Sequence, residues 1–404
     1  MSELWAGWSK REIEIRPGHS MAGYIARNGA SARTLDPLFV RALAFKQAGL
    51  SAGIIVADLL LISNRWAENL RTHLARVLST RKEHIVVAAT HTHSGPQVDT
   101  FPFDFNSVRD RRSFERSLMR HIGQSMEEAL GQAAQSREPV EVATAHIPVR
   151  GVATDRNNPK RSKTQRFFLV RFEGARSAAV LGVYGCHSTV LGPENRLLSG
   201  DLHGGIARCL EKSVSVAVMA AGAAANISTR FTRRHQTPHE VASLAAKVAR
   251  QAAMARFQPL HDAGLAIGEQ MARLHVSRFA KIPATKLRNA GRLGVVRAEA
   301  MVVRERLARA PEFAAGSITA PLTVLRIGTL SLAALPFEIY SDTGEFLWRR
   351  ARVIPLCYAN GYWGYIPSRA AGSEDYEAIS SPFVRTSDAK LRRAVISLQK
   401  HLVD

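Results

Sequence analysis

The chain has 404 residues, of which 46% are hydrophobic and 22% are charged, and this composition excludes a disordered protein. Its formal charge of +21 comes from 55 lysines and arginines against 34 aspartates and glutamates, which favours acidic partners without choosing among them. The apolar runs are all shorter than the roughly 20 residues that a membrane-spanning helix needs.

Short β-branched runs alternate with longer helical patterns along the chain, which is typical of an α/β or mixed α+β domain. We predict strands, in chain order, at 53–58, 84–90, 140–147, 167–172, 178–185, 214–220, 322–327, 330–335 and 353–359. We predict helices at 64–78, 108–135, 204–212, 238–256, 295–308, 341–350 and 387–403. The helix at 238 has Thr237 and Glu240 as a capping box. The basic, weakly patterned segment 273–315 is expected to be an insertion or a lid.

The run His91-Thr-His93-Ser94-Gly95-Pro96 follows a predicted strand and is the most informative motif of the chain. Two imidazoles spaced i, i+2 in extended backbone project to the same side, so one segment could offer two nitrogen donors to a single point. A metal site, or an acid/base pair beside one, needs that arrangement. Because an isolated histidine is more often a hydrogen-bonded structural residue, the metal interpretation depends on further ligands.

Four other predicted strands also end in residues suited to a site, which is where α/β proteins usually carry their chemistry. They run into Cys186-His187-Ser188, the small-residue turn 221–228, Pro336-Phe337-Glu338, and the segment 360–367. Taken singly, His187 could be a core histidine, Glu338 a first-turn helix carboxylate and Tyr365 an aromatic core residue. Their shared position after strands favours a common site.

In this order, the phrases THTHSGP, CHS, NIS, LPFE and NGYWGYIPS…DYE resemble the catalytic domain of the neutral (non-lysosomal) ceramidases and their bacterial relatives. The resemblance runs from Met21 to Tyr376. It implies a layered zinc-hydrolase domain in which strands end in metal-binding loops, with one Zn²⁺ per chain held by two histidines, a glutamate and a tyrosine. The implied ligands are His91, His187, Glu338 and Tyr365.

The same resemblance assigns roles to four further residues. It implies that His93 lies beside the metal for proton transfer or transition-state stabilisation, and that Ser228 is a nucleophile or a substrate-positioning hydroxyl. It also implies that Arg156 contacts the substrate and that Tyr376 lies near the reacting carbonyl. The residue types suit this chemistry, because two neutral nitrogens and a carboxylate leave zinc able to lower the pKa of bound water to about 7. A phenol of pKa about 10 is an unusual fourth ligand, since it must be polarised by the metal.

The chain departs from the family pattern in three respects. The family turn usually reads Gly-Asp-(Val or Ile)-Ser, where this chain has Ala225-Asn226-Ile227-Ser228, and alanine at a positive-φ position would move the turn. We expect one catalytic domain over 1–404, without the C-terminal immunoglobulin-like domain of many ceramidases. We also expect no secretion signal. Basic residues follow two of the site segments and favour an acidic substrate if they rim the site: Lys160, Arg161, Lys163, Arg230, Arg233 and Arg234.

These observations predict a zinc-dependent amidohydrolase acting on a soluble, anionic acyl amide. Three alternatives stay open: a ceramidase proper acting on N-acylsphingosine, an enzyme that forms or cyclises an amide at the same site, and a degenerate member that binds a ligand through its basic surface. Asp58 and Asp201 flank predicted strands, and either could orient a ligand imidazole or cap a helix.

The sequence also bears on location and partners. Charge interrupts the N-terminal segment where a signal peptide has its apolar core, so we expect a cytoplasmic protein. The three cysteines form no CxxC pair, which fits reduced thiols: Cys186, Cys209 and Cys357. No zinc-finger spacing or RNP-like motif accompanies the charge, so nucleic-acid binding is not expected, whereas peripheral contact with a membrane stays open. The pattern does not indicate an oligomeric state.

Overall fold

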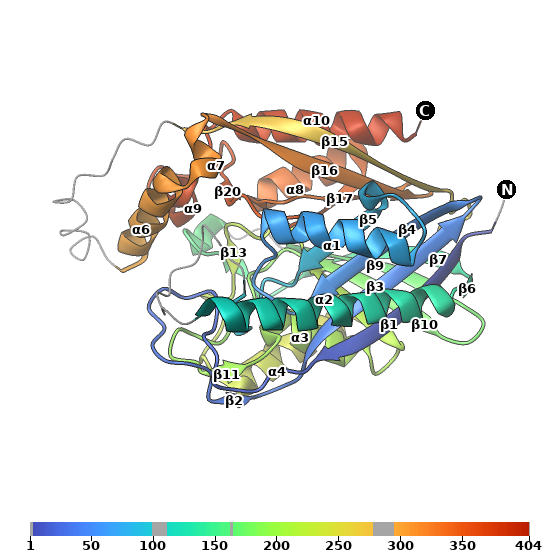
Figure 1. Cartoon of the computed structure of the whole chain (residues 1–404), viewed down its shortest axis with the longest axis horizontal. Helices are drawn as coiled ribbons and strands as arrows, with labels where there is room; N and C mark the ends of the chain where they lie inside the picture. Colours follow the sequence, from blue (N-terminus) through green and yellow to red (C-terminus); the bar gives the residue numbers. More distant parts are fainter. Residues whose placement is uncertain (1–2, 99–110, 162–164, 278–294, 404) are drawn as a thin grey trace.

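Two five-stranded sheets pack face to face at the centre of the protein in the computed structural model (Figure 1). The structure describes residues 3–98, 111–161, 165–277 and 295–403. The first sheet has the order β5-β4-β3-β1-β6, with β1 (Trp5–Ile13), β3 (Leu38–Gln47), β4 (Leu50–Ala57), β5 (Ile85–Ala89) and β6 (Glu138–Pro139). The second has the order β12-β10-β9-β7-β14, with β7 (Glu141–Val149), β9 (Gln165–Glu173), β10 (Ala178–Tyr184), β12 (Val216–Ala221) and β14 (Gln258–Pro259).

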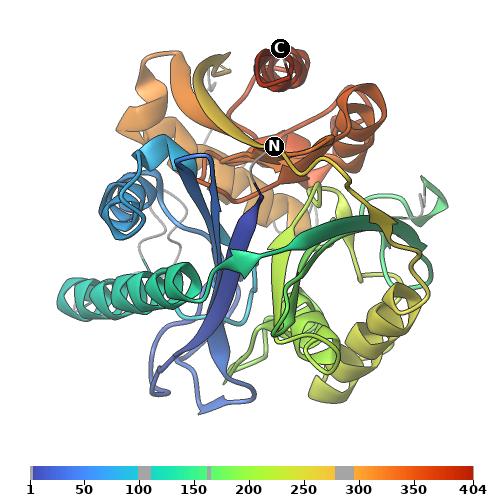
Figure 2. The ribbon, with the colours of Figure 1, turned by 90° about the vertical axis from the view of Figure 1, so that its right-hand side faces the viewer.

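The first sheet is covered on its outer face by two helices, α1 (Asn64–Val77) and α2 (Arg111–Gln135) (Figure 2). Strands β4 and β5 run parallel and are apolar almost throughout, because both of their faces are buried. Helix α1 begins after Ser63, whose hydroxyl accepts the N–H of Trp66, and it buries Trp66, Leu70 and Leu74 along one stripe. The short helix η1 (Lys82–His84) then leads into β5.

The second sheet is covered on its outer face by α3 (Asp201–Leu210) and α4 (Pro238–Ala252). Helix α4 begins where its sequence predicts, because the Thr237 hydroxyl accepts the Glu240 N–H at 3.3 Å and Pro238 occupies the first turn. The Glu240 carboxylate, however, accepts the N–H of Arg234 instead of returning to Thr237. Only half of the predicted capping box forms.

A third sheet, of order β15-β16-β17-β19, lies above the other two in Figure 2. Its strands are β15 (Leu265–His275), β16 (Ser317–Ile327), β17 (Leu330–Ala334) and β19 (Val353–Leu356). Leu325, Leu332 and Ile354 share one core with the inner faces of the first two sheets. The helices packed with or next to this sheet are α6 (Val295–Arg309), α7 (Pro311–Ala314), α8 (Ser341–Ala351), α9 (Tyr376–Ser380) and α10 (Ser387–His401).

Short two-residue strands join loops that are far apart in the sequence. The pairs are β2 (Arg33–Thr34) with β11 (Leu197–Leu198), β8 (Thr154–Asp155) with β13 (Ile227–Ser228), and β18 (Glu338–Ile339) with β20 (Tyr365–Ile366). The short helix η2 (Pro159–Arg161) follows β8. These small pairings gather at the ends of the large sheets and position the site described below.

The mixed α/β class is confirmed, since each large sheet contains both parallel and antiparallel pairs. Strands β1, β3 and β15 are absent from the prediction. In β1 charged and apolar residues are interspersed, and most of β15 is half-exposed, so neither has a strong periodic pattern. The predicted helix start at 108–110 and residues 278–294 of the predicted insertion lie outside the described residues.

No helix in the described ranges is both long and apolar enough to cross a membrane. The three cysteines are unpaired thiols, and two of them are buried.

Candidate metal centre

The loops that follow β5 and β10 are joined to each other at the ends of the two central sheets. Thr92 and Ser188 form an isolated parallel bridge, and the N–H of His93 donates to the carbonyl of Ser188 at 3.2 Å. Because Thr92 lies between His91 and His93, and Ser188 follows His187, this bridge brings three imidazoles into one group. Their ligand atoms all lie within 4.8 Å of one another.

The backbone at His91 differs from the extended geometry that the i, i+2 spacing predicts. His91 has a φ of +59°, which places it in the left-handed region. A non-glycine residue is held there only when its surroundings determine it, and such strain concentrates at functional sites. The two rings still converge, edge to face with centroids 4.8 Å apart, but through a turn and not through a pleated strand.

The imidazoles of His91 and His187 are both oriented by backbone carbonyls. Nδ1 of His91 donates to Leu60 O at 2.8 Å, and Nδ1 of His187 donates to Ala224 O at 2.9 Å. Both contacts fix the tautomer and leave the Nε2 lone pairs free, as in metal-ligating histidines. Nε2 of His91 lies 3.2 Å from Nε2 of His93.

Glu338 contributes a carboxylate to the same group. Its Oε2 lies 3.1 Å from Nε2 of His187 and 3.9 Å from Nε2 of His91. Two buried tyrosines hold it there, since Tyr358 donates to Oε2 at 2.9 Å and Tyr362 donates to Oε1. Strand pairing sets Glu338 directly opposite Tyr365.

Electrostatics at this group favour neutral His91 and His93 beside an ionised Glu338. Burial lowers the pKa of His91 to about 3 and that of His93 well below its ordinary value. Burial alone would raise the pKa of Glu338, but the adjacent histidines and the Tyr362 hydroxyl lower it to about 2. Neutral nitrogen and anionic oxygen are the donor types that a divalent metal such as zinc takes.

One buried nitrogen atom, Nε2 of His187, indicates that this group of side chains binds an ion that is not part of the polypeptide. Nε2 of His187 is inaccessible and makes no hydrogen bond to any described residue, although Glu338 lies close to it. A buried polar atom without a partner costs about 1–3 kcal/mol, so such atoms are rare unless an ion satisfies them. His91, His187 and Glu338 therefore fit a bound metal.

A loop near the N-terminus packs against His93. The ring of Tyr24 lies 5.0 Å from the imidazole, and Arg27 donates to the His93 carbonyl at 2.8 Å. Gly23 has a φ of +103°, and a Cβ at this position would lie 2.6 Å from the imidazole ring. Only glycine therefore allows the loop to pass so close to His93.

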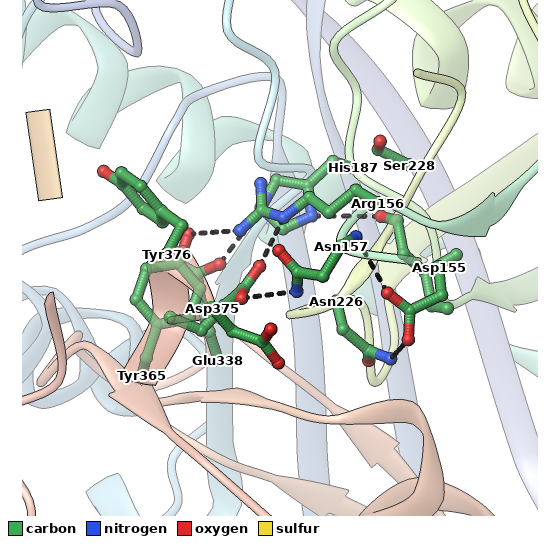
Figure 3. Close-up of polar contacts among 12 residues, drawn as sticks. Asp155, Arg156, Asn157, His187, Asn226, Ser228, Glu338, Tyr365, Asp375 and Tyr376 are labelled. Atoms are coloured by element: carbon green, nitrogen blue, oxygen red, sulfur yellow. Dashed lines mark hydrogen bonds and ion pairs between the residues drawn. The ribbon is translucent and has the colours of Figure 1, made fainter. Parts of the chain in front are cut away.

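Arg156, Tyr365 and Tyr376 form the next layer of the site (Figure 3). Arg156 follows β8, and its Nη2 donates to the Tyr365 hydroxyl at 3.2 Å. Its guanidinium lies 5.8 Å from the Tyr365 ring centre and 5.5 Å from that of Tyr376, at the start of α9. The two tyrosine rings meet edge to face. The sequence-predicted residues of this layer are thus brought together.

Ser228 is positioned by β13, whose pairing sets it opposite Thr154, and its Oγ accepts the N–H of Arg230. The two turn residues that differ from the family pattern, Ala225 and Asn226, are both accommodated by the structure. Ala225 is not among the residues with positive φ, so the alanine that stands where the family has glycine introduces no backbone strain. The side chain of Asn226 joins Asp155 to the N–H of Ser341 and therefore ties the turn to α8.

The basic residues near these loops differ in their surroundings. Lys160, Arg161, Arg230 and Arg234 are exposed, whereas Arg233 is half-buried and donates to the Thr189 carbonyl at 2.6 Å. Lys163 lies outside the described residues. The exposed members of this group supply positive charge to the surface beside the site.

Neither aspartate singled out in the sequence contacts a ligand imidazole. Asp58 accepts from the Phe39 N–H and from Arg41, and the Leu60 carbonyl orients His91 in its place. Asp201, at the start of α3, accepts the N–H groups of Val190 and Leu191 and so anchors the loop after His187. Sequence reasoning overlooked Tyr358, Tyr362 and Glu377, although all three lie inside the quoted NGYWGY and DYE segments or beside them.

Another buried histidine, His203, supports the loop that follows His187 and makes stability depend on pH. His203 accepts from the Ser188 hydroxyl at 2.5 Å and donates to Tyr184 O, and burial lowers its pKa to about 4. Because the folded pKa lies below the unfolded value of about 6.5, its contribution to stability is complete above 6.5 and is lost as pH falls towards 4. Between pH 7 and 5 the unfolding free energy that His203 contributes falls by about 2 kcal/mol.

We therefore expect metal-free wild-type protein to lose about 2 kcal/mol more unfolding free energy between pH 7 and 5 than metal-free His203→Gln. Urea denaturation at the two pH values measures this difference. The exposed His239 provides the control, since His239→Gln should retain the wild-type pH dependence. Equal losses in wild type and His203→Gln would show that His203 is not the titrating group.

Both the sequence and the fold are similar to those of known proteins. The model of the neutral/alkaline non-lysosomal ceramidase N-terminal domain matches residues 17–234, which is more than half of the chain. The fold is similar to that of neutral ceramidase from Pseudomonas aeruginosa, with a TM-score of 0.76 and 17% identity over 100% of this chain and 75% of that one. It is also similar to a ceramidase complexed with C2, with a TM-score of 0.77 and 17% identity over 100% of this chain and 76% of that one. No match was found among curated proteins.

Proposed function

The chain belongs to the neutral/alkaline non-lysosomal ceramidase family, and we propose that it is a zinc-dependent amidohydrolase that cleaves the N-acyl bond of an acyl amide. The observation that carries this proposal is the convergence of His91, His187 and Glu338, with both imidazoles held by backbone carbonyls. We assign Tyr365, opposite Glu338, as the fourth ligand. A zinc ion bound there would polarise the amide carbonyl and make a hydroxide available near neutral pH.

The residues around that ion have distinct tasks in the proposed reaction. Neutral His93 accepts the proton that the attacking water loses as the C–O bond forms. It then passes that proton to the leaving nitrogen, and the C–N bond breaks in this second step. Arg156 donates to the carbonyl oxygen as negative charge develops on it, and Tyr376 lies over the same guanidinium. Ser228 positions the substrate from the opposite loop.

We propose an anionic acyl amide as the substrate, because exposed Lys160, Arg161, Arg230 and Arg234 flank the loops that carry Arg156 and Ser228. Membership of the ceramidase family favours a second candidate, N-acylsphingosine. The two differ in charge and in chain length, which makes them separable by experiment.

The test is metal analysis followed by a substrate panel. Protein purified without chelator is expected to carry about one zinc per chain. It should hydrolyse N-acyl amino acids faster than uncharged N-acyl sugars or short-chain ceramides. Preference for a ceramide over every anionic amide would replace the first candidate by the second. Zinc-loaded protein that hydrolyses none of them, yet joins an acid to an amine, would show that the enzyme forms amides.

A further inference from the structure

Glu377 is a completely buried carboxylate beside Arg156 that no step above uses. It lies in the first turn of α9, directly after Tyr376, and its exposed fraction is 0%. Oε1 accepts from Nε of Arg156 at 2.5 Å, while Oε2 accepts from the Asn157 side chain at 2.8 Å and from the Tyr340 hydroxyl at 3.2 Å. Hydrogen-bond donors to both oxygens therefore fix the orientation of the Glu377 carboxylate.

The contact with Glu377 determines how Arg156 presents its donors. Nε is used by Glu377 and Nη2 by Tyr365, while the backbone N–H of Arg156 donates to Asn226 O at 2.8 Å. Nη1 makes no hydrogen bond to the described residues. Because the guanidinium is planar and rigid, fixing Nε also fixes the direction of Nη1.

We propose that Glu377 is a positioning residue that aims Arg156 at the substrate carbonyl and balances its charge. The inference rests on the proposed function, in which Arg156 contacts that carbonyl. With Glu377 in place the pair is neutral, so Arg156 donates hydrogen bonds without adding net charge to the site. A donor contributes to catalysis only if it is in place before the charge develops, and Glu377 supplies that preorganisation.

A buried ion pair is by itself weak evidence for function, because such pairs also occur where they only hold the fold. The chain contains a matched example. Arg71 and Glu269 form a pair with side chains 1% and 9% exposed, and Arg71 also donates to Ile85 O. This pair joins α1 to the third sheet away from the metal centre. Glu269→Gln therefore serves as the control for removing one buried carboxylate charge.

The kinetic test compares Glu377→Gln with Glu269→Gln. Glutamine keeps the shape of the side chain and one acceptor oxygen, but it loses the negative charge that binds Nε of Arg156. We expect Glu377→Gln to lower kcat about tenfold to a hundredfold with KM changed less than about threefold and with zinc content unchanged. Glu269→Gln should lower only the melting temperature. Equal kcat losses in the two variants, or a Glu377→Gln effect confined to KM, would overturn the proposal.

A second measurement depends on neither zinc nor a substrate. Arg156→Ala leaves a cavity lined by the Glu377 carboxylate, and guanidinium below denaturing concentrations should bind there, as measured by calorimetry on metal-free protein. Arg156→Ala/Glu377→Gln should bind at least about tenfold more weakly. Equal guanidinium binding by the two variants would overturn the proposal. Guanidinium should also restore part of the amidase activity of Arg156→Ala only while Glu377 is present.

Arg156→Lys provides a variant that keeps a cation beside Glu377 if Arg156→Ala does not fold. Lysine cannot reproduce the planar fork, so its kcat should already be low, and adding Glu377→Gln should lower it less than threefold further. Independent, multiplying losses would contradict a role through Arg156. If wild-type protein hydrolyses no amide, the proposed function fails, whereas guanidinium binding still reports whether Glu377 holds the Arg156 side chain.

Discussion

Replacement of His187 by alanine is expected to remove zinc binding and to lower amide hydrolysis at least about a thousandfold. Its Nδ1 is held by the carbonyls of Ala224 and Ile227, and its Nε2 is buried beside Glu338 with no other partner in the part of the chain that the structure describes. Losing one nitrogen ligand removes several kcal/mol of transition-state stabilisation, and about 4 kcal/mol corresponds to a thousandfold in rate. Metal content after dialysis and kcat/KM on the best substrate measure the two effects.

The matched control for this prediction is His203→Gln. His203 is as buried as His187, but its nitrogens contact Ser188 and Tyr184 and not the group of three imidazoles. We expect this variant to keep about one zinc per chain while its unfolding free energy falls. A His187→Ala protein that retains zinc and near wild-type activity would refute the metal site as assigned.

Replacement of His93 by alanine is expected to keep the zinc but to lower kcat about 100- to 10,000-fold, the range for loss of a general acid–base. His93 lies in the same group, with its Nε2 3.2 Å from that of His91. Its Nδ1, however, is buried without a hydrogen bond to any carbonyl or other group of the described residues. It lacks the second contact that fixes His91 and His187 as ligands. Parallel zinc and turnover measurements distinguish a proton carrier from a ligand.

Tyr24→Phe is the control for packing around His93. Phenylalanine keeps the ring that contacts the imidazole and loses only the hydroxyl contact with Leu191 O. We expect its kcat to stay within about fivefold of wild type, because the imidazole remains in place. Loss of zinc from His93→Ala would instead make His93 a ligand, and the assignment of Tyr365 as the fourth donor would then fall.

The segments that carry the site could be found from sequence because chemistry-bearing residues follow buried strands. The apolar run before His91 and the one before His187 are both buried on two faces in the structure, so each loop emerges at a sheet end. The family resemblance carried by those loops is confirmed. The backbone at His91 was predicted wrongly, because a left-handed residue is imposed by contacts with distant loops that no local pattern encodes.

The supporting residues were overlooked for the same physical reason. Tyr358 stacks on His91 with ring centres 3.9 Å apart, and Glu377 holds a side chain more than 200 positions earlier in the chain. Their spacing in sequence from the residues they support follows no helix or strand period. Asp58 illustrates the converse, since it has a suitable side chain in a suitable place but is taken by Arg41.

The sequence by itself determined the mixed α/β class, most of the helices and strands, and the loops in which the candidate ligands lie, because periodic burial and short motifs are local properties. Only the tertiary structure decided which atoms meet. Three weak pairings, Thr92 with Ser188, β8 with β13 and β18 with β20, bring the loops into register, and backbone carbonyls then orient two imidazoles. Those contacts join residues that are 27 to 96 positions apart, so their geometry follows from the packing of three sheets and not from any one segment.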